Sequence, residues 1–212
     1  KKTKKIIVIP KHNKKTVVLE GGALDVNGEG ILITTKECLL SKVQQRNPGF
    51  TISDYEKIFA KYLGVKKVIW LEKGIKGDDT HGHIDDVAKF VSKNKIFIND
   101  TKNKKDVNYK NIKKNLKILQ KEKNLDNKKF EIIKIPLPNP KFFRGTRVPA
   151  SYMNFYITNK KVLVPTFRDV KDKVILKIFK KHFKNKKIIP IDCSDLIWGF
   201  GAIHCMTIQE PQ

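Results

Sequence analysis

Short runs of β-branched and other apolar residues alternate along the chain with longer lysine-rich stretches, in which apolar residues recur at helical spacing. This alternation is typical of an α/β protein. Asparagine- and glycine-bearing stretches such as 26–30 and 157–161 separate some of the runs and predict hairpin turns. The predicted strands lie within residues 4–10, 15–22, 30–35, 66–71, 88–99, 130–138, 153–167 and 186–192.

Three stretches are predicted to be helices: 51–64, 108–123 and 171–183. The first has acidic residues near its start and Gly64 as a stop signal. The apolar positions at helical spacing are Ile52, Tyr55, Ile58, Phe59 and Leu63 in the first helix, Ile112, Leu116 and Leu119 in the second, and Val174, Ile178 and Phe179, expected to face inward, in the third.

The order of these elements repeats. A hairpin, a helix and a further strand recur about three times, in units of roughly 60 to 70 residues each. A period of this size favours radially repeated modules over a doubly wound sheet. We therefore expect residues 1–212 to form a single domain of about three strand-strand-helix-strand units.

Composition adds little to this fold but excludes several classes of function. Of the 45 basic residues, only Arg46, Arg144, Arg147 and Arg168 are arginine, and the lysines are spread over the whole chain. We therefore attribute the net charge of +24 to a lysine-rich composition and not to a binding patch, and we expect no nucleic-acid partner. The apolar runs are too short for a membrane span or a signal peptide. Three unpaired cysteines complete the expectation of a cytoplasmic protein with reduced thiols.

The densest polar cluster lies in "GIKGDDTHGHIDDVAKF", residues 74–90. Its glycines predict a loop that leads into an apolar strand. If the segment is extended, His83 and Asp85 point to the same face, so an imidazole and a carboxylate can reach one pocket. A solvated acidic turn is the plainer interpretation. A metal site is a weaker one, because no third histidine has ligand spacing.

Two further positions are candidates for chemistry. Glu20 ends a predicted strand and is followed by two glycines, which carries its carboxylate from a buried element to an opening. Cys205 lies close to the last residue, behind Gly199 and Gly201, either as a small buried residue or as a nucleophile. In an extended segment His204 points away from Cys205, which makes His83 the better candidate for its partner.

Four segments, at 19–48, 67–91, 149–167 and 201–211, closely resemble in order and spacing the agmatine deiminase family, also called Porphyromonas-type peptidyl-arginine deiminases. The resemblance implies a five-bladed α/β propeller. It also implies hydrolysis of agmatine to N-carbamoylputrescine and ammonia, with no metal or organic cofactor and with some self-association.

The resemblance also implies a role for each motif residue. Cys205 of "HC" matches the nucleophile, and His83 of "GHID" matches the general acid/base. Asp85 matches a carboxylate that grips the guanidinium, and Glu20 of "LEGG" matches the acid that partners the histidine. The remaining substrate-site positions expected from the motifs are Asp79 of "GDD" and Gly201.

The sequence departs from the family pattern at several points. Family members carry an additional N-terminal portion with a Trp-x-Arg-Asp motif, whose aspartate is a second clamp on the guanidinium, and this chain has no such motif. We therefore expect the C-terminal portion of a larger enzyme. His81 stands where the family usually has an aspartate, and Trp198 and Phe200 interrupt a run that is commonly glycine-rich. These departures leave the identity of the substrate undecided. The alternatives are peptidyl-arginine or free arginine as the substrate and, outside the enzymes, an inactive fragment or a basic interaction protein.

Overall fold

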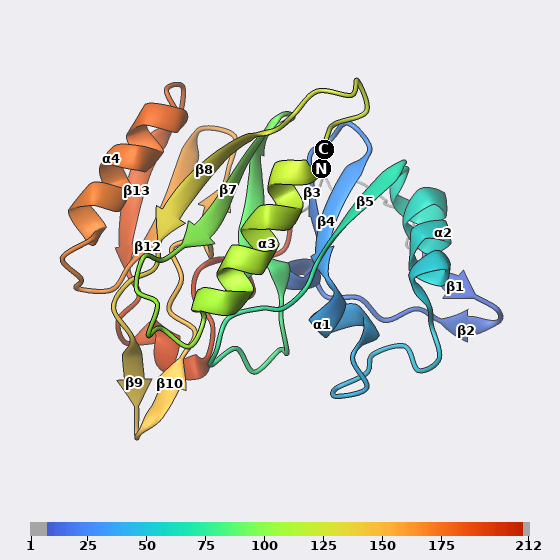
Figure 1. The fold of residues 1–212 in the computed structure, drawn as a ribbon, viewed down its shortest axis with the longest axis horizontal. Coiled ribbons are helices and arrows are strands. Elements are labelled where there is room, and N and C mark those ends of the chain that lie inside the picture. The colour runs from blue at the N-terminus through green and yellow to red at the C-terminus, as the bar shows by residue number, and fades with distance from the viewer. Residues whose placement is uncertain (1–7, 210–212) are drawn as a thin grey trace, which may run out of the picture.

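Three units of the same construction follow one another along the chain in the computed structural model, which describes residues 8–209 (Figure 1). In each unit two antiparallel strands form a hairpin, a helix crosses over, and a third strand returns parallel to the second strand of the hairpin. The units comprise β3 (Asp25–Val26), β4 (Ile31–Thr35), α2 (Ile52–Leu63) and β5 (Lys67–Leu71); β6 (Ala88–Ser92), β7 (Lys95–Asp100), α3 (Tyr109–Lys121) and β8 (Glu131–Pro136); and β11 (Tyr156–Ile157), β12 (Lys161–Thr166), α4 (Asp172–His182) and β13 (Lys187–Asp192).

This order confirms the repeat of strand, strand, helix and strand that the sequence predicts. The turn at 27–30 shows why the first hairpin closes. The Asn27 side chain accepts hydrogen bonds from the backbone amides of Glu29 and Ile31, while Gly28 and Gly30 have φ values of 77° and 85°. These positive φ values favour glycine, because a Cβ atom strains the backbone there.

The three predicted helices are present. Thr51 and Asp54 form a capping box at the start of α2, and Gly64 ends the helix in the left-handed conformation with φ of 65°. In α3, Ile112, Leu116 and Leu119 are buried as expected.

One predicted core position of α4 is wrong. Phe179 is fully buried, and Ile178 packs against the core from a partly buried position. Val174 is 52% exposed, and its neighbour Ile175 is fully buried in its place. The buried stripe of α4 is therefore rotated by one residue at its first turn.

The N-terminal strands differ most from the prediction. Within 15–22 only Lys15–Thr16 forms a strand (β2), which pairs with β1 (Lys11–His12). Of the predicted strand at 4–10, residues 8–10 form no strand and 4–7 lie outside the described residues. The elements outside every predicted strand and helix include β1, β3, the short helix α1 (Lys36–Leu40), and the hairpin of β9 (Lys141–Phe143) and β10 (Thr146–Val148).

The core lies largely between the units. Ile31 and Ile33 of β4 pack in one cluster with Phe90 and Ile98 of the second unit. Phe97, on the opposite face of β7 from Ile98, packs with Phe155 and Phe179 of the third unit. Neighbouring units therefore share two core clusters, while a third cluster, which includes Leu32, Tyr55 and Phe59, lies within the first unit.

No helix in the described part of the chain has the length and apolar character needed to cross a membrane.

The aromatic contacts of Phe97 give the first prediction. Its ring centroid lies 5.2 Å from that of Phe179 and 6.1 Å from that of Phe155, and the side chain is fully buried. Phe97→Ala should lower the free energy of unfolding by about 3 to 5 kcal/mol, because the truncation leaves a cavity where the second and third units pack together.

Phe142→Ala is the matched control for this change. The Phe142 side chain is 62% exposed, so the same truncation should change stability by less than about 0.5 kcal/mol. Urea unfolding of both variants measures the difference. Equal losses in the two variants would contradict the shared core.

Candidate active site

Three single-turn 3-10 segments meet at the candidate site: η1 (Gly21–Ala23), η2 (Ile84–Asp86) and η4 (His204–Met206). Each lies in a connecting segment rather than within a sheet. The predicted extended conformations around His83 and Cys205 are therefore wrong in detail. The chemistry-bearing side chains still converge, because the turns bring them to one place.

Gly22 allows this convergence. A Cβ atom at Gly22 would lie 2.6 Å from Nδ1 of His83 and 2.7 Å from Oδ2 of Asp85. Both side chains therefore pass directly over the Gly22 backbone, and only glycine leaves them room. The imidazole and the carboxylate share one side of the site, as predicted.

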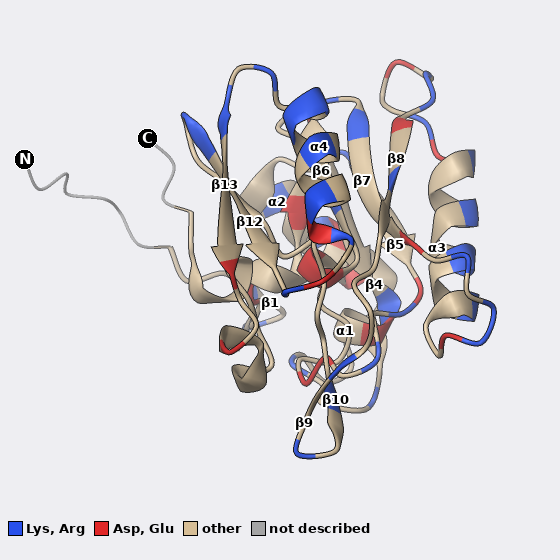
Figure 2. Cartoon of the chain, turned by 90° about the vertical axis from the view of Figure 1, so that its left-hand side faces the viewer, with Lys and Arg blue, Asp and Glu red and all other residues tan. Residues whose placement is uncertain are grey.

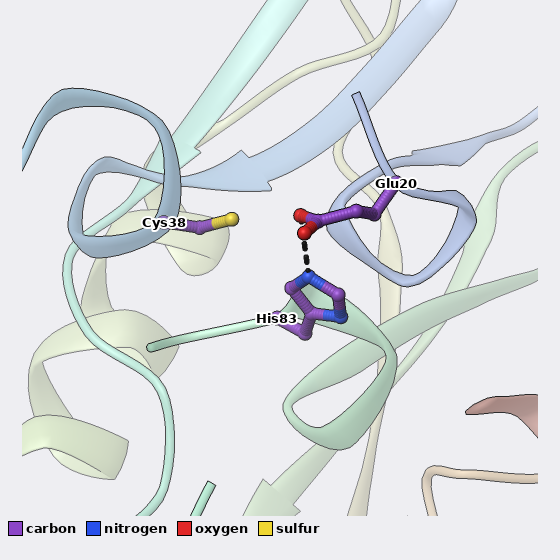
Figure 3. Close-up of side chains that lie close together, drawn as sticks. All are labelled: Glu20, Cys38 and His83. Atoms are coloured by element: carbon purple, nitrogen blue, oxygen red, sulfur yellow. Dashed lines mark hydrogen bonds and ion pairs between the residues drawn. The ribbon is translucent and has the colours of Figure 1, made fainter. Parts of the chain in front are cut away.

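Glu20 and His83 form a direct pair. Nε2 of His83 lies 2.9 Å from Oε2 of Glu20, and the two side chains point toward each other (Figure 3). Nε of Arg46 lies 3.0 Å from the same carboxylate oxygen. Partial burial opposes ionisation of Glu20, but the contacts with His83 and Arg46 bring its pKa below the ordinary value. Glu20 is thus an anion that holds the ring of His83.

The loop that carries His83 is fixed by Asp78. Oδ2 of Asp78 accepts hydrogen bonds from the backbone amides of Gly82 and His83, at 2.8 and 2.9 Å. His81 points to Ser41, with Nε2 3.0 Å from the hydroxyl oxygen. Asp79 is exposed on this loop. Its predicted role in substrate binding remains a prediction.

Asp85 lies at the centre of the site. Its side chain is 1% exposed, and its Oδ2 lies 2.8 Å from Nδ1 of His204 and 3.6 Å from Sγ of Cys205. Desolvation opposes ionisation of Asp85, but the hydrogen bond from His204 and the charge of Lys89 bring its pKa below the ordinary value. Oδ1 of Asp85 is buried and has no hydrogen-bond partner among the described residues.

His204 has a different role from the one that its place in the sequence suggests. Burial lowers the pKa of His204, so its ring is neutral at pH 7 and donates the Nδ1 proton to Asp85. The ring therefore orients the central carboxylate.

Cys205 presents its thiol beside this carboxylate. Nδ2 of Asn154 lies 3.0 Å from Sγ, and Oδ1 of Asn154 accepts from the backbone amide of His204 at 2.8 Å. A Cβ atom at Gly201 would lie 2.9 Å from Cβ of Cys205, so this predicted site glycine makes room for the nucleophile. Desolvation, followed by the charges of Asp86 and Asp85, raises the pKa of the Cys205 thiol.

The structure thus brings together four of the predicted residues: Glu20, His83, Asp85 and Cys205. Sequence reasoning missed Arg46, Asp78, Asn154 and His204 as their supports. The arginine and the asparagine carry no local signal, because their contacts depend on segments that are 26 and 51 residues away. Trp198, expected near the cysteine, stacks on Phe143 at 4.8 Å between ring centroids.

Within residues 8–209, two groups of side chains have the donor atoms of a metal site. They are Glu20, Cys38 and His83, which Figure 3 shows, and Asp85, Asp86 and Cys205; in each group the ligand atoms lie within 4.8 Å of one another. In the first group Arg46 already forms an ion pair with the carboxylate of Glu20, and burial raises the pKa of the Cys38 thiol to about 12. A cation there would compete with the guanidinium of Arg46 and would have to displace a firmly held proton.

Fold and site together define an α/β protein of repeated units with a thiol, an imidazole and buried carboxylates at one site, a set suited to covalent chemistry on a cationic substrate. Comparison with known proteins is specific. A family model described as Porphyromonas-type peptidyl-arginine deiminase matches residues 1–211. The chain belongs to this family.

Individual relatives agree with this assignment. The agmatine deiminase of Medicago truncatula is 36% identical over 92% of this chain and 58% of its own length. A solved agmatine deiminase of Enterococcus faecalis has a TM-score of 0.85 at 33% identity, covering 92% of this chain and 57% of that one. A C. jejuni agmatine deiminase with substrate bound has a TM-score of 0.83 at 33% identity, covering 90% and 55%. The chain thus spans a little over half the length of these relatives.

The contact at Gly22 gives a second prediction. Gly22→Ala should displace His83 and Asp85, because its methyl group would overlap both side chains. We expect the imidazole signals of His83 to shift in NMR spectra and the free energy of unfolding to fall by about 1 to 3 kcal/mol.

Gly21→Ala is the control, since a Cβ atom at Gly21 meets nothing within 4 Å. It should leave the His83 signals and the stability close to those of the unmodified chain. A Gly22→Ala chain that behaves in the same way would show that the close approach is absent in solution.

Proposed function

We propose that this chain provides the nucleophile and the acid/base pair of an agmatine deiminase, which hydrolyses the guanidinium of agmatine to N-carbamoylputrescine and ammonia. The observation that carries the proposal is the buried carboxylate of Asp85, whose Oδ2 lies 3.6 Å from Sγ of Cys205 and whose Oδ1 has no hydrogen-bond partner among residues 8–209. A buried anionic acceptor without a donor is costly, and the N–H groups of a planar cation would satisfy it.

Substrate binding also accounts for the state of the thiol. In the free site, desolvation and then the carboxyl groups of Asp86 and Asp85 raise the pKa of the Cys205 thiol, which favours its protonated form. A guanidinium beside these carboxylates offsets their charge and makes the thiolate easier to form. The cationic substrate would thereby favour formation of the nucleophile that attacks it.

The reaction then follows from the arrangement of the side chains. The Cys205 thiolate adds to the guanidinium carbon and forms a C–S bond. His83, oriented by Glu20, protonates one nitrogen, and the C–N bond breaks to release ammonia. The same imidazole then accepts a proton from water, which adds to the thiouronium carbon. Breakage of the C–S bond releases the urea product and regenerates the thiol.

The family resemblance supports two finer parts of the proposal. The three units would form part of a five-bladed propeller, and a second carboxylate outside this chain would complete the grip on the guanidinium. Free agmatine is the first choice of substrate. Peptidyl-arginine is the second, because the description of the matching family names it.

The third prediction tests catalysis by Cys205. The chain should release ammonia and a carbamoyl product from agmatine, and Cys205→Ala should abolish the release because the C–S bond cannot form. Cys193→Ala is the control, since Cys193 is fully buried in the core cluster of the third unit. Turnover that survives in Cys205→Ala would contradict the proposal.

The fourth prediction tests recognition of the cation by a route that does not need turnover. At about pH 7, 2-chloroacetamidine should alkylate Cys205 faster than neutral 2-chloroacetamide, which has the same leaving group. The cationic reagent interacts with Asp85, so Asp85→Asn should remove a preference of about 2 to 5 kcal/mol. Peptide mass spectrometry locates the label.

Equal rates for the two reagents would show that the site does not recognise a planar cation. A preference for the amidine that persists in Asp85→Asn would assign the recognition to another group.

A further inference from the structure

Beneath the candidate site lies a buried lysine that the reaction described above does not use. Lys89 belongs to β6, the strand that follows η2, and the residue is only 4% exposed. Lysine is rarely buried to this extent without a partner. Its Nζ donates to the backbone carbonyl of Phe155 at 2.9 Å and lies 4.9 Å from the centroid of the Phe155 ring.

The carbonyl that holds this ammonium belongs to the residue next to Asn154, whose Nδ2 lies 3.0 Å from Sγ of Cys205 and 3.1 Å from Oδ1 of Asp86. Burial lowers the pKa of Lys89, and this lowering is opposed by Asp25 from β3, Asp85 and Asp86 from η2, and Cys205 from η4. Among residues 8–209 no carboxylate forms an ion pair with Lys89 within 4.0 Å. His204 is a further ionisable group that the charge of Lys89 influences.

Resting on the function proposed above, we propose that Lys89 is a positioning residue whose buried charge stabilises the Cys205 thiolate and the ionised Asp85. Burial, followed by the charge of Asp85, raises the pKa of the Asp86 carboxyl well above its ordinary value, so the repulsion in the site is chiefly between the ionised Asp85 and a thiolate at Cys205. A fixed cation on the protein side offsets this repulsion, while the open side remains free for a cationic substrate.

The carboxyl group of Asp25 is a further acidic group that interacts with the charge of Lys89. Its Oδ2 accepts a hydrogen bond from the backbone amide of Phe90 at 2.6 Å, which places the carboxylate beside β6. Burial raises the pKa of the Asp25 carboxyl to about 7. Above that pH an ionised Asp25 offsets part of the positive charge of Lys89. Removal of the Asp25 charge should therefore favour the Cys205 thiolate.

The test follows alkylation of Cys205 by neutral 2-chloroacetamide across about pH 6 to 10. Lys89→Met keeps the length and apolar stem of the side chain and removes the charge. We expect its alkylation rate at about pH 7.5 to fall about tenfold, with the pH profile displaced upward by about one unit. Lys89→Arg should stay within about threefold of the unmodified chain, because it retains the cation.

Asp25→Asn supplies the opposite change and does not depend on whether Lys89→Met folds. It should raise the alkylation rate above about pH 7 by a factor of about two to five. Circular dichroism and thermal unfolding report the folding of each variant. A folded Lys89→Met with an unshifted profile, or a Lys89→Arg as slow as Lys89→Met, would overturn the proposal, and so would an Asp25→Asn that slows alkylation.

These outcomes do not depend on whether the proposed activity is correct. The reagent is neutral and no substrate turns over, so the profile reports the environment of the thiol alone. A chain that hydrolyses no agmatine but shows the Lys89 shift would refute only the proposed activity. Turnover in Lys89→Met with an unshifted profile would refute only the role of Lys89.

Discussion

The buried carboxylate of Asp85 imposes the constraint on which the rest of the site depends. An ionised group at 1% exposure is stable only when neighbouring donors and charges replace the lost water. His204 supplies a hydrogen bond, and Lys89 supplies charge from within the protein. Oδ1 nevertheless has no donor among the described residues. The protein thus keeps Asp85 charged while one of its buried acceptors stays unsatisfied.

The overall positive charge of the chain opposes binding of a cation at this site, and the positions of the charged groups reduce this effect. A net charge of +24 repels a cationic ligand at long range. Figure 2 shows lysines along the helices α3 and α4, and acidic residues both near the centre and in several outer loops. Ionic screening over about 8 Å at physiological salt weakens the distant lysines. The adjacent carboxylates, which are desolvated, are screened far less and decide the local potential.

The sequence predicts the fold better than it predicts the supports of the site. Periodicity located the three helices and the repeated units, because each buried stripe is a local signal. It misplaced Val174, since the direction in which α4 packs depends on the other units. The motifs identified Glu20, His83, Asp85 and Cys205, whereas Arg46 and Asn154 act through contacts across the fold. His204 was set aside on the assumption of an extended segment, whereas in the 3-10 turn both His204 and Cys205 reach Oδ2 of Asp85.

Because neighbouring units share their cores, the chemistry and the stability of the chain are coupled. Cys205 follows the third unit, His83 and Asp85 precede the second, and Glu20 precedes the first. The distances between these side chains are therefore set by how the units pack, through clusters such as that of Phe97 and Phe179. A sub-ångström shift between two units would separate the thiol from its carboxylate without altering either residue. Packing far from the site is thus part of what positions it.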